Sequence, residues 1–282
     1  MHRLIKTLLL IPALSCFTIG FVSPAASFGQ VQTKESLNRP MEFVPPDLAD
    51  RRRPNDRPKG GASRGGCSLA SDHPPLTALV PIVSTTNVAS GSEPSGSDLG
   101  VEPSNSTYEA VANLTTQPYP DFWFYVPYVL DGSIPLRFVL QDKDDNLVYQ
   151  TEVAPVANSA GIVQMSLPNT LTPLAEGEAY HWFFIAQCDS RTPVFVEGWI
   201  ERTPMTAEMR SQLAQASPRD QAALYANSGI WQDALDTLVA LYTTTPSSPS
   251  LQEDWAELLT SAGLAEVAAE QFLGDVSTTP QR

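Results

Sequence analysis

The chain has 282 residues, a formal net charge of −14 and 42% hydrophobic residues. This length suits one large domain or two modest ones, and the acidic balance excludes a nucleic-acid binder by charge. The 25 prolines are about 9% of the 282 residues, above the usual share of about 5%, and they indicate long irregular stretches. Composition also excludes fibrous, collagen-like and multi-span membrane proteins.

The segment 1–27 has the pattern of a secretory signal peptide. Met1 to Lys6 form a short basic start, Leu8 to Val22 is mostly apolar, and small residues follow from Ser23 to Ser27. A signal peptidase selects small side chains at such a point. The alternative is an uncleaved membrane anchor, but the apolar run is shorter than the ~20 residues that cross a bilayer. We expect export to the periplasm or the extracellular cell envelope, with no transmembrane span in the mature chain.

Export changes the interpretation of the cysteines. Cys16 leaves with the signal peptide, so the mature chain keeps Cys67 and Cys188 in a compartment where thiols oxidise. We predict one disulfide between them, closing a loop of about 121 residues that loop entropy would stabilise by ~5 kcal/mol at most. Two free, buried thiols are the alternative. With no third sulfur and two mature histidines, a zinc site is not expected, and neither is any cofactor.

Residues 28–66 form a basic arm that precedes an acidic body. The arm has eight Lys and Arg against five Asp and Glu, whereas residues 67–282 have seven against 26. It is rich in proline, ends in a glycine-rich run and has almost no large apolar residues, so burial cannot offset its ordering entropy. We expect disorder up to Cys67. The arm is either a solvated spacer or an electrostatic tether to an anionic envelope polymer, the acidic body or a partner.

Residues 67–205 are expected to form a β-sandwich domain. After a short opening run at 76–81, residues 83–120 are rich in Ser, Gly, Asn and Thr and are expected to be mostly a long loop. Strand-like runs then lie at 122–126, 136–140, 147–153, 162–167, 179–186 and 194–200. Seven short strands predict an antiparallel sandwich of the immunoglobulin or fibronectin type.

Tyr180 is expected to have a structural role in this sandwich. It follows a turn glycine, Gly177, and stands at the start of a late strand. This arrangement resembles the tyrosine corner of immunoglobulin-like domains, in which the phenol hydroxyl bonds back to the preceding loop.

Aromatic residues lie on both faces of two predicted strands. Residues 122–125 are all aromatic, and residues 181–185 alternate aromatic side chains between the two faces. Because side chains alternate across a pleated strand, both faces of the sheet need cover. One face would meet the second sheet, and the other is either packed internally or an exposed ligand platform. The candidate ligand or partner residues are Trp123, Trp182, Trp199, Trp231 and Trp255.

Residues 206–276 change to a helical period, and residues 277–282 are expected to be a disordered tail. Similar residues recur 34 positions apart in this region, for example Gly229 with Gly263 and Ala234 with Ala268. This distance is the repeat length of tetratricopeptide repeats. In such repeats glycine turns one helix into the next and alanine permits close helix approach. Helices are predicted at 206–215, 218–228, 231–243, 249–262 and 265–273.

Two helical hairpins are fewer than the three or more repeats that usually stand alone. We therefore expect the helices to pack on the outer face of the aromatic sheet, giving an α+β fold. If their concave face stays free, it could bind a peptide or a partner helix.

No motif of a known catalytic class is present. The chain lacks a nucleophile elbow, a phosphate loop, a zinc-protease helix and a dinucleotide fingerprint. His181 lies inside a predicted strand, where a packed imidazole is more common than a general base. Glu197 and Glu201 share a strand face near Asp189, but nothing in the sequence brings two carboxylates to one cleft. We expect no enzyme activity.

An acidic run at residues 142–146 has two interpretations. Asp142, Asp144 and Asn146 have the spacing that opens a calcium loop, but Leu147 and Val153 stand where glycine and a bidentate glutamate belong. A hairpin turn explains the run better, since Asp and Asn tolerate turn conformations. These three residues are therefore a weak metal candidate.

The order of the motifs resembles a family described as domain of unknown function 928, found in cyanobacteria. The resemblance covers about residues 51–264 and rests on eight segments, at 51–54, 60–67, 76–81, 122–128, 180–184, 188–189, 194–202 and 224–235. The family has no established activity, so the resemblance implies a bacterial exported protein with paired cysteines rather than a mechanism.

The sequence thus predicts a non-catalytic, exported protein of the cell envelope that binds an unknown protein partner. The alternative, from another class, is a glycan binder or a calcium-dependent ligand binder that uses the β-sandwich. Nucleic acid is not an expected partner.

Overall fold

The computed structural model describes residues 40–46, 73–84, 108–110, 113–154, 158–188 and 193–277. The expected signal peptide, most of the basic arm, Cys67, Asp189 and the last five residues lie outside these ranges.

The described strands form two large sheets and a small ribbon. The four-stranded sheet, here the inner sheet, has the order β1 (Thr77–Ala78), β5 (Asp121–Val126), β8 (Gly161–Ser166), β11 (Phe272–Asp275). The five-stranded sheet, here the outer sheet, has the order β4 (Asn113–Thr115), β10 (Val194–Arg202), β9 (Ala179–Ala186), β6 (Leu136–Gln141), β7 (Leu147–Glu152). The ribbon pairs β2 (Ile82–Ser84) with β3 (Tyr108–Ala110).

Most strand pairs are antiparallel, as the sequence predicts, but two are parallel. β4 runs parallel to β10 at one edge of the outer sheet, and β11 runs parallel to β8 at one edge of the inner sheet. Both strands come from segments that were predicted to be loop or helix. They join the sheets through long connections, which parallel pairing requires. The expectation of a purely antiparallel sandwich is therefore wrong at these two edges.

The first core lies between the two sheets. Every second residue of the central strands points into it, as the period of two in a pleated strand requires. Phe124 of β5 stacks on Phe184 of β9 with a ring separation of 4.1 Å, and Phe138 of β6 is fully buried. Trp182 also lies here, against Gly198, where an added Cβ would approach its ring to 2.5 Å.

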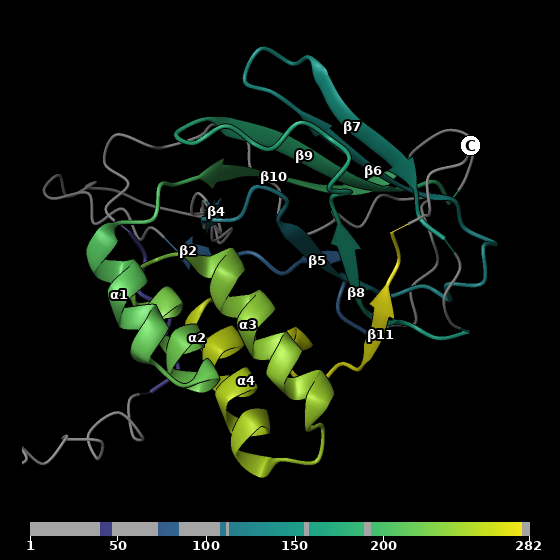
Figure 1. Cartoon of the computed structure of the whole chain (residues 1–282). Coiled ribbons are helices and arrows are strands. Elements are labelled where there is room, and N and C mark those ends of the chain that lie inside the picture. The colour runs from purple at the N-terminus through teal and green to yellow at the C-terminus, as the bar shows by residue number, and fades with distance from the viewer. Residues whose placement is uncertain are drawn as a thin grey trace, which may run out of the picture. The chain divides into compact units, whose positions relative to one another are not determined.

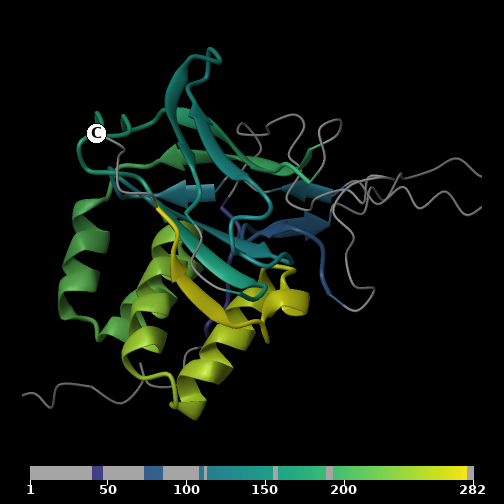
Figure 2. The same ribbon diagram turned by 90° about the vertical axis from the view of Figure 1, so that its right-hand side faces the viewer.

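The second core lies between the inner sheet and the helices. Figures 1 and 2 show the helices on the side of β5, β8 and β11 that faces away from β9 and β10. Trp123 and Tyr125 of β5 and Ile162 of β8 point into this core. The four α-helices of the described residues are α1 (Ala207–Gln215), α2 (Pro218–Asn227), α3 (Trp231–Thr244) and α4 (Pro249–Ser261).

All four α-helices of the described residues begin within one residue of their predicted starts, and side chains cap two of them. The Thr206 hydroxyl caps α1 by accepting the Met209 amide, and the Ser217 hydroxyl caps α2 by accepting the Asp220 amide. The predicted helix at 265–273 is wrong. Only a short 3-10 turn forms, η2 (Ala265–Val267), because residues 272–275 pair with β8 instead.

Two expected irregular regions are ordered in part. Residues 40–46 belong to the arm predicted to be disordered, yet Met41 and Phe43 are buried among the helices. The expected loop at 83–120 contains β4, whose residues are all buried. In both places tertiary contacts outweigh a local composition that indicates no structure.

Candidate functional site

Residues 40–46, here the N-terminal strap, lie against α2 and α4. The strap donates three backbone hydrogen bonds to the helices. Its Met41 amide lies 3.3 Å from Oε2 of Glu257, and its Phe43 amide lies 2.9 Å from Oγ of Ser261. The Val44 amide donates to the Ala226 carbonyl at 3.1 Å. Helix groups thus satisfy the backbone of an extended segment.

Alternate side chains anchor the strap. Met41 is fully buried and Phe43 is 4% exposed, whereas Glu42 and Val44 point outward. The Phe43 ring meets the indole of Trp231 edge to face at a centroid distance of 5.3 Å. An open groove of about 410 Å³ continues beside the first residues of the strap, lined by Pro40, Met41, Glu42, Ala256, Glu257, Thr260 and Ser261.

Gly229 and Gly263, which are 34 residues apart, each lie just after the end of a helix. Gly229 follows α2 with φ +72°, and Gly263 follows α4 with φ +76°, a conformation that favours glycine. A Cβ at Gly229 would lie 2.7 Å from Pro46 of the strap, and one at Gly263 would lie 2.9 Å from the Ile82 carbonyl oxygen. An extended segment from earlier in the chain therefore crosses each helix end.

Ala234 and Ala268, also 34 residues apart, lie in the second core. Ala234 is fully buried in α3, and Ala268 is partly buried after η2. The Ala268 carbonyl accepts the indole N–H of Trp255 at 3.0 Å, which fixes this tryptophan inside the helical layer.

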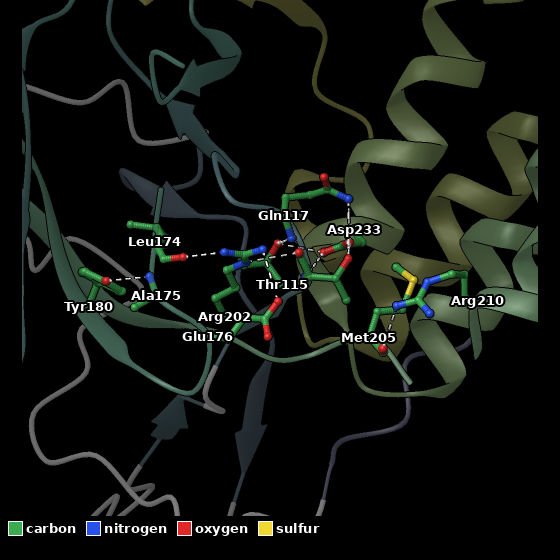
Figure 3. A network of polar contacts seen from close by, with 11 residues as sticks. Thr115, Gln117, Leu174, Ala175, Glu176, Tyr180, Arg202, Met205, Arg210 and Asp233 are labelled. Atoms are coloured by element: carbon green, nitrogen blue, oxygen red, sulfur yellow. Dashed lines mark hydrogen bonds and ion pairs between the residues drawn. The ribbon is translucent and has the colours of Figure 1, made fainter. Parts of the chain in front are cut away.

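Asp233 of α3 joins the helices to the outer sheet. It is only 2% exposed, and its carboxylate accepts hydrogen bonds from the Thr115 hydroxyl at 2.8 Å and the Thr116 amide at 3.0 Å. The Thr116 hydroxyl and the Gln117 side chain donate to its other oxygen. Figure 3 shows Thr115 and Gln117 directed at Asp233. Each oxygen of this buried carboxylate therefore accepts two hydrogen bonds. We call Asp233 the buried clamp because it ties α3 to β4 and the residues that follow it.

Asp236, one turn later in α3, faces the inner sheet. It accepts the indole N–H of Trp123 at 2.6 Å and the side-chain amide of Gln232 at 3.2 Å. Burial raises the pKa of the Asp236 carboxyl well above its ordinary value, and the nearby Asp121 raises it further. Burial also raises the pKa of Asp121.

An ion pair ties α2 to α4. The Arg219 guanidinium donates to both carboxylate oxygens of Asp254, with Nε at 2.7 Å from Oδ2. Asp254 is 4% exposed, whereas the Arg219 side chain is 26% exposed, so this pair is only partly removed from water. The sequence did not predict these polar residues as site residues, because no local pattern shows that a charged side chain on a helix is buried. They are Asp233, Asp236, Arg219 and Asp254.

The predicted tryptophans are mostly core residues. Trp123, Trp182, Trp231 and Trp255 are at most 5% exposed, and the Trp231 indole donates to the Leu79 carbonyl at 2.7 Å. These four side chains pack the two cores. Trp199 of β10 is partly exposed on the outer sheet.

Trp199 belongs to an aromatic patch on the outer sheet. His181 of β9 stands directly opposite it, and the two rings stack at 4.5 Å with an interplanar angle of 2°. Glu197 lies 3.4 Å from the imidazole Nε2, and burial lowers the pKa of His181. Glu201, which the sequence grouped with Glu197, is buried at the end of the same strand.

Tyr180 forms a hydrogen bond to the turn that precedes β9. Its hydroxyl accepts the Ala175 amide at 2.9 Å, five residues upstream. Arg202 supports the same turn, because its guanidinium donates to the Leu174 carbonyl at 2.7 Å and pairs with Glu176 (Figure 3). Gly177 closes the turn with φ +78°.

The acidic run forms the β6–β7 hairpin turn. Asp142 accepts the backbone amides of Asp144 and Asn146 at 2.9 and 3.0 Å, as well as the Asn146 side-chain amide. Asp145 adopts φ +62° at the tip. Asp142 thus acts as a turn acceptor, and Asp144 pairs with Lys143 in solvent. Within the described ranges, no group of three or more His, Cys, Asp or Glu is placed to hold a metal.

The disulfide stays a prediction. Cys188 lies just after β9, packed against the core between the sheets, whereas Cys67 is outside the described residues. As for membrane spans, none of the helices in the described part of the chain combines the length and the apolarity that crossing a bilayer needs.

Comparisons with known proteins give a family but no activity. No curated protein matches the sequence. Among solved structures, a β-glucuronidase (GUS) from Parabacteroides merdae aligns with 10% identity and a TM-score of 0.25, over 58% of this chain and 28% of that chain. A structural similarity this low is no evidence for a shared fold or activity. The family profile described as Domain of Unknown Function (DUF928) matches residues 59–272, most of the chain. The chain therefore belongs to the DUF928 family.

Proposed function

We propose that this protein is a non-catalytic, exported protein of the bacterial cell envelope whose helical layer binds another protein. Export is inferred from the basic start, apolar run and small residues of positions 1–27. Cyanobacteria are the expected source, from the order of motifs described above.

The N-terminal strap is the main support for this binding role. Helix groups accept three of its backbone amides, and the helical core takes two of its side chains. Main-chain hydrogen bonds combined with pockets for alternate side chains are the general chemistry by which proteins bind extended peptides. The helical layer therefore has a surface suited to a peptide of a partner protein.

The finer fold interpretation fits this role. We interpret the two sheets as an immunoglobulin-like sandwich, with the Tyr180 bond as its corner. We interpret α2 with α3, and α4 with η2, as two tetratricopeptide-like hairpins, the second one shortened. Docking on the inner sheet gives these few hairpins the core that they lack alone.

We also propose the disulfide between Cys67 and Cys188. Peptide mapping of the protein, purified from the envelope without reductant, should give one cross-linked peptide pair that reduction separates. Recovery of both cysteines as alkylated free thiols would contradict the bridge.

A site-specific cross-link tests the binding role. A photoreactive residue would replace exposed Ala256, which lines the groove, and a matched control would replace exposed Leu147 on the distant β6–β7 hairpin. We expect irradiation of intact cells to give one stoichiometric protein adduct from position 256 and none from position 147. Equal labelling at both positions, or none, would contradict a role for the helical layer.

A further inference from the structure

We propose that the surface of α2 and α4 that the strap covers, together with the open groove beside it along α4, binds an extended peptide of a partner protein, and that the strap is its intramolecular competitor. The ligand would have an apolar residue, any residue, a second apolar residue, any residue and then proline, flanked by basic side chains. This inference rests on the proposed function and adds the chemistry of the ligand.

The strap itself supplies the pattern. Met41 and Phe43 point into the helical core, Glu42 and Val44 point out, and Pro45 and Pro46 follow. In an extended segment, residues two apart share a face, so one face binds and the other is free to vary. Proline favours the extended conformation and lacks an amide donor, which suits a position where no helix acceptor is needed.

The acceptors in the groove recognise a backbone rather than particular side chains. Ser261 Oγ, Glu257 Oε2 and the Ala226 carbonyl take the amides of residues 43, 41 and 44. Any peptide that runs in the same direction can offer the same donors. Discrimination would come from the two apolar pockets, of which the one for Phe43 is bounded by the Trp231 ring.

The strap is held in a way that permits exchange. Its last apolar residue, Val44, is 44% exposed, and the groove beside Pro40 and Met41 is open toward solvent along α4. A competing peptide can therefore make its first contacts on α4 while the strap is still bound. An intramolecular competitor lowers the apparent affinity of the free ligand by the fraction of molecules with an open groove.

Charge favours basic flanks on the ligand. Residues 206–277 contain ten acidic and two basic side chains, and one of those two, Arg219, is paired with Asp254. The strap is flanked in sequence by Arg39 on one side and Arg51, Arg52 and Arg53 on the other. Asp233 and Asp254 are buried, but Glu253 and Glu257 are exposed on α4, and Glu257 lines the groove. These carboxylates would attract such a peptide, and added salt should weaken the attraction.

The test measures binding of a labelled peptide with the sequence of residues 39–53 to the full mature chain by fluorescence anisotropy. In the variant with Met41→Ser and Phe43→Ser the strap loses its anchors, so we expect this chain to bind the peptide at least tenfold more tightly than wild type. The milder variant Phe43→Leu should give an intermediate gain. A peptide carrying the same two serine substitutions should not bind.

A groove variant provides the matched control. Adding Ser261→Ala and Glu257→Ala to the released chain should weaken peptide binding at least fivefold, because two backbone amides lose their acceptors. Should the double-serine chain fail to fold, the Phe43→Leu chain decides the question. A folded variant that binds the peptide no better than wild type overturns the inference. If the released chain fails to bind the peptide but the cross-link at position 256 still captures a partner, only the further inference is wrong. If the cross-link also captures no partner, the proposed function is wrong as well.

Discussion

The indole N–H of Trp123 in β5 lies 2.6 Å from a carboxylate oxygen of Asp236 in α3. The inner sheet and the helical layer therefore share a hydrogen bond in addition to their common apolar core. The pKa of Asp236 is raised mainly by burial, so its ionised form is unfavourable in the folded protein. We therefore expect the contact between the helices and the inner sheet to depend on pH.

We expect the replacement Asp236→Asn to change the pH dependence of stability. The folded pKa is raised above the unfolded value of about 3.9, so between the two the folded state binds more protons and stability falls as pH rises. Asparagine keeps an acceptor for Trp123 but does not ionise. The free energy of unfolding in urea, measured from pH 4 to 8, should therefore decline less for the variant than for wild type. A difference that stays constant with pH would contradict the assignment.

Removal of the buried clamp should destabilise the protein strongly. Asp233→Ala leaves the donors of Thr115, Thr116 and Gln117 without their acceptor, and we expect a loss of about 3 kcal/mol in unfolding free energy. Asp144→Ala, at an exposed turn position, is the control and should change stability by less than about 0.5 kcal/mol. Comparable losses in both variants would show that Asp233 is not a clamp.

The turn glycines allow a separation of backbone strain from crowding. Gly177, Gly229 and Gly263 all have φ between +72° and +78°, but an added Cβ meets nothing within 4 Å at Gly177. Gly177→Ala should therefore cost only the strain of a left-handed residue, about 1 to 2 kcal/mol. Gly229→Ala and Gly263→Ala should cost more, because the methyl group meets Pro46 or the Ile82 carbonyl. Thermal and urea unfolding of the three variants measure the difference, and equal losses would mean that strap and ribbon move aside freely.

The Tyr180 hydroxyl should contribute measurably to stability. Tyr180→Phe removes the acceptor of the Ala175 amide and should cost about 1 to 1.5 kcal/mol in urea unfolding. Tyr149→Phe, on partly exposed β7, is the matched control with little expected effect. If both variants keep wild-type stability, the corner bond is not stabilising.

Patterns within single segments predicted much of the fold. The strands at 122–126, 136–140, 147–153, 162–167, 179–186 and 194–200 appear within two residues of their expected bounds, because their aromatic and β-branched residues alternate clearly. The glycines at 229 and 263 share one conformation, as their spacing of 34 residues suggested.

The remainder depends on partners distant in sequence. Asn113 to Thr115 form a buried strand through pairing with β10 and through hydrogen bonds to Gln232 and Asp233, all from much later in the chain. Phe272 belongs to a helical pattern, yet it pairs with Ile162 and packs on Trp123. Met41 and Phe43 were the available signal for the strap, as two alternating apolar residues before a proline pair, but the helices that bury them begin only at Ala207. Local composition holds no information on such contacts.

Amide hydrogen exchange of the strap in the full chain tests the account most directly. If the strap is a bound peptide, the amides of Met41, Phe43 and Val44 should be protected, and they should open with a smaller free energy than the core strands β5 and β9. Excess peptide of residues 39–53 should lower that protection without affecting the strands. Strap amides that exchange only through global unfolding, or that show no protection at all, would contradict the claim that the helical layer holds this segment as a displaceable ligand.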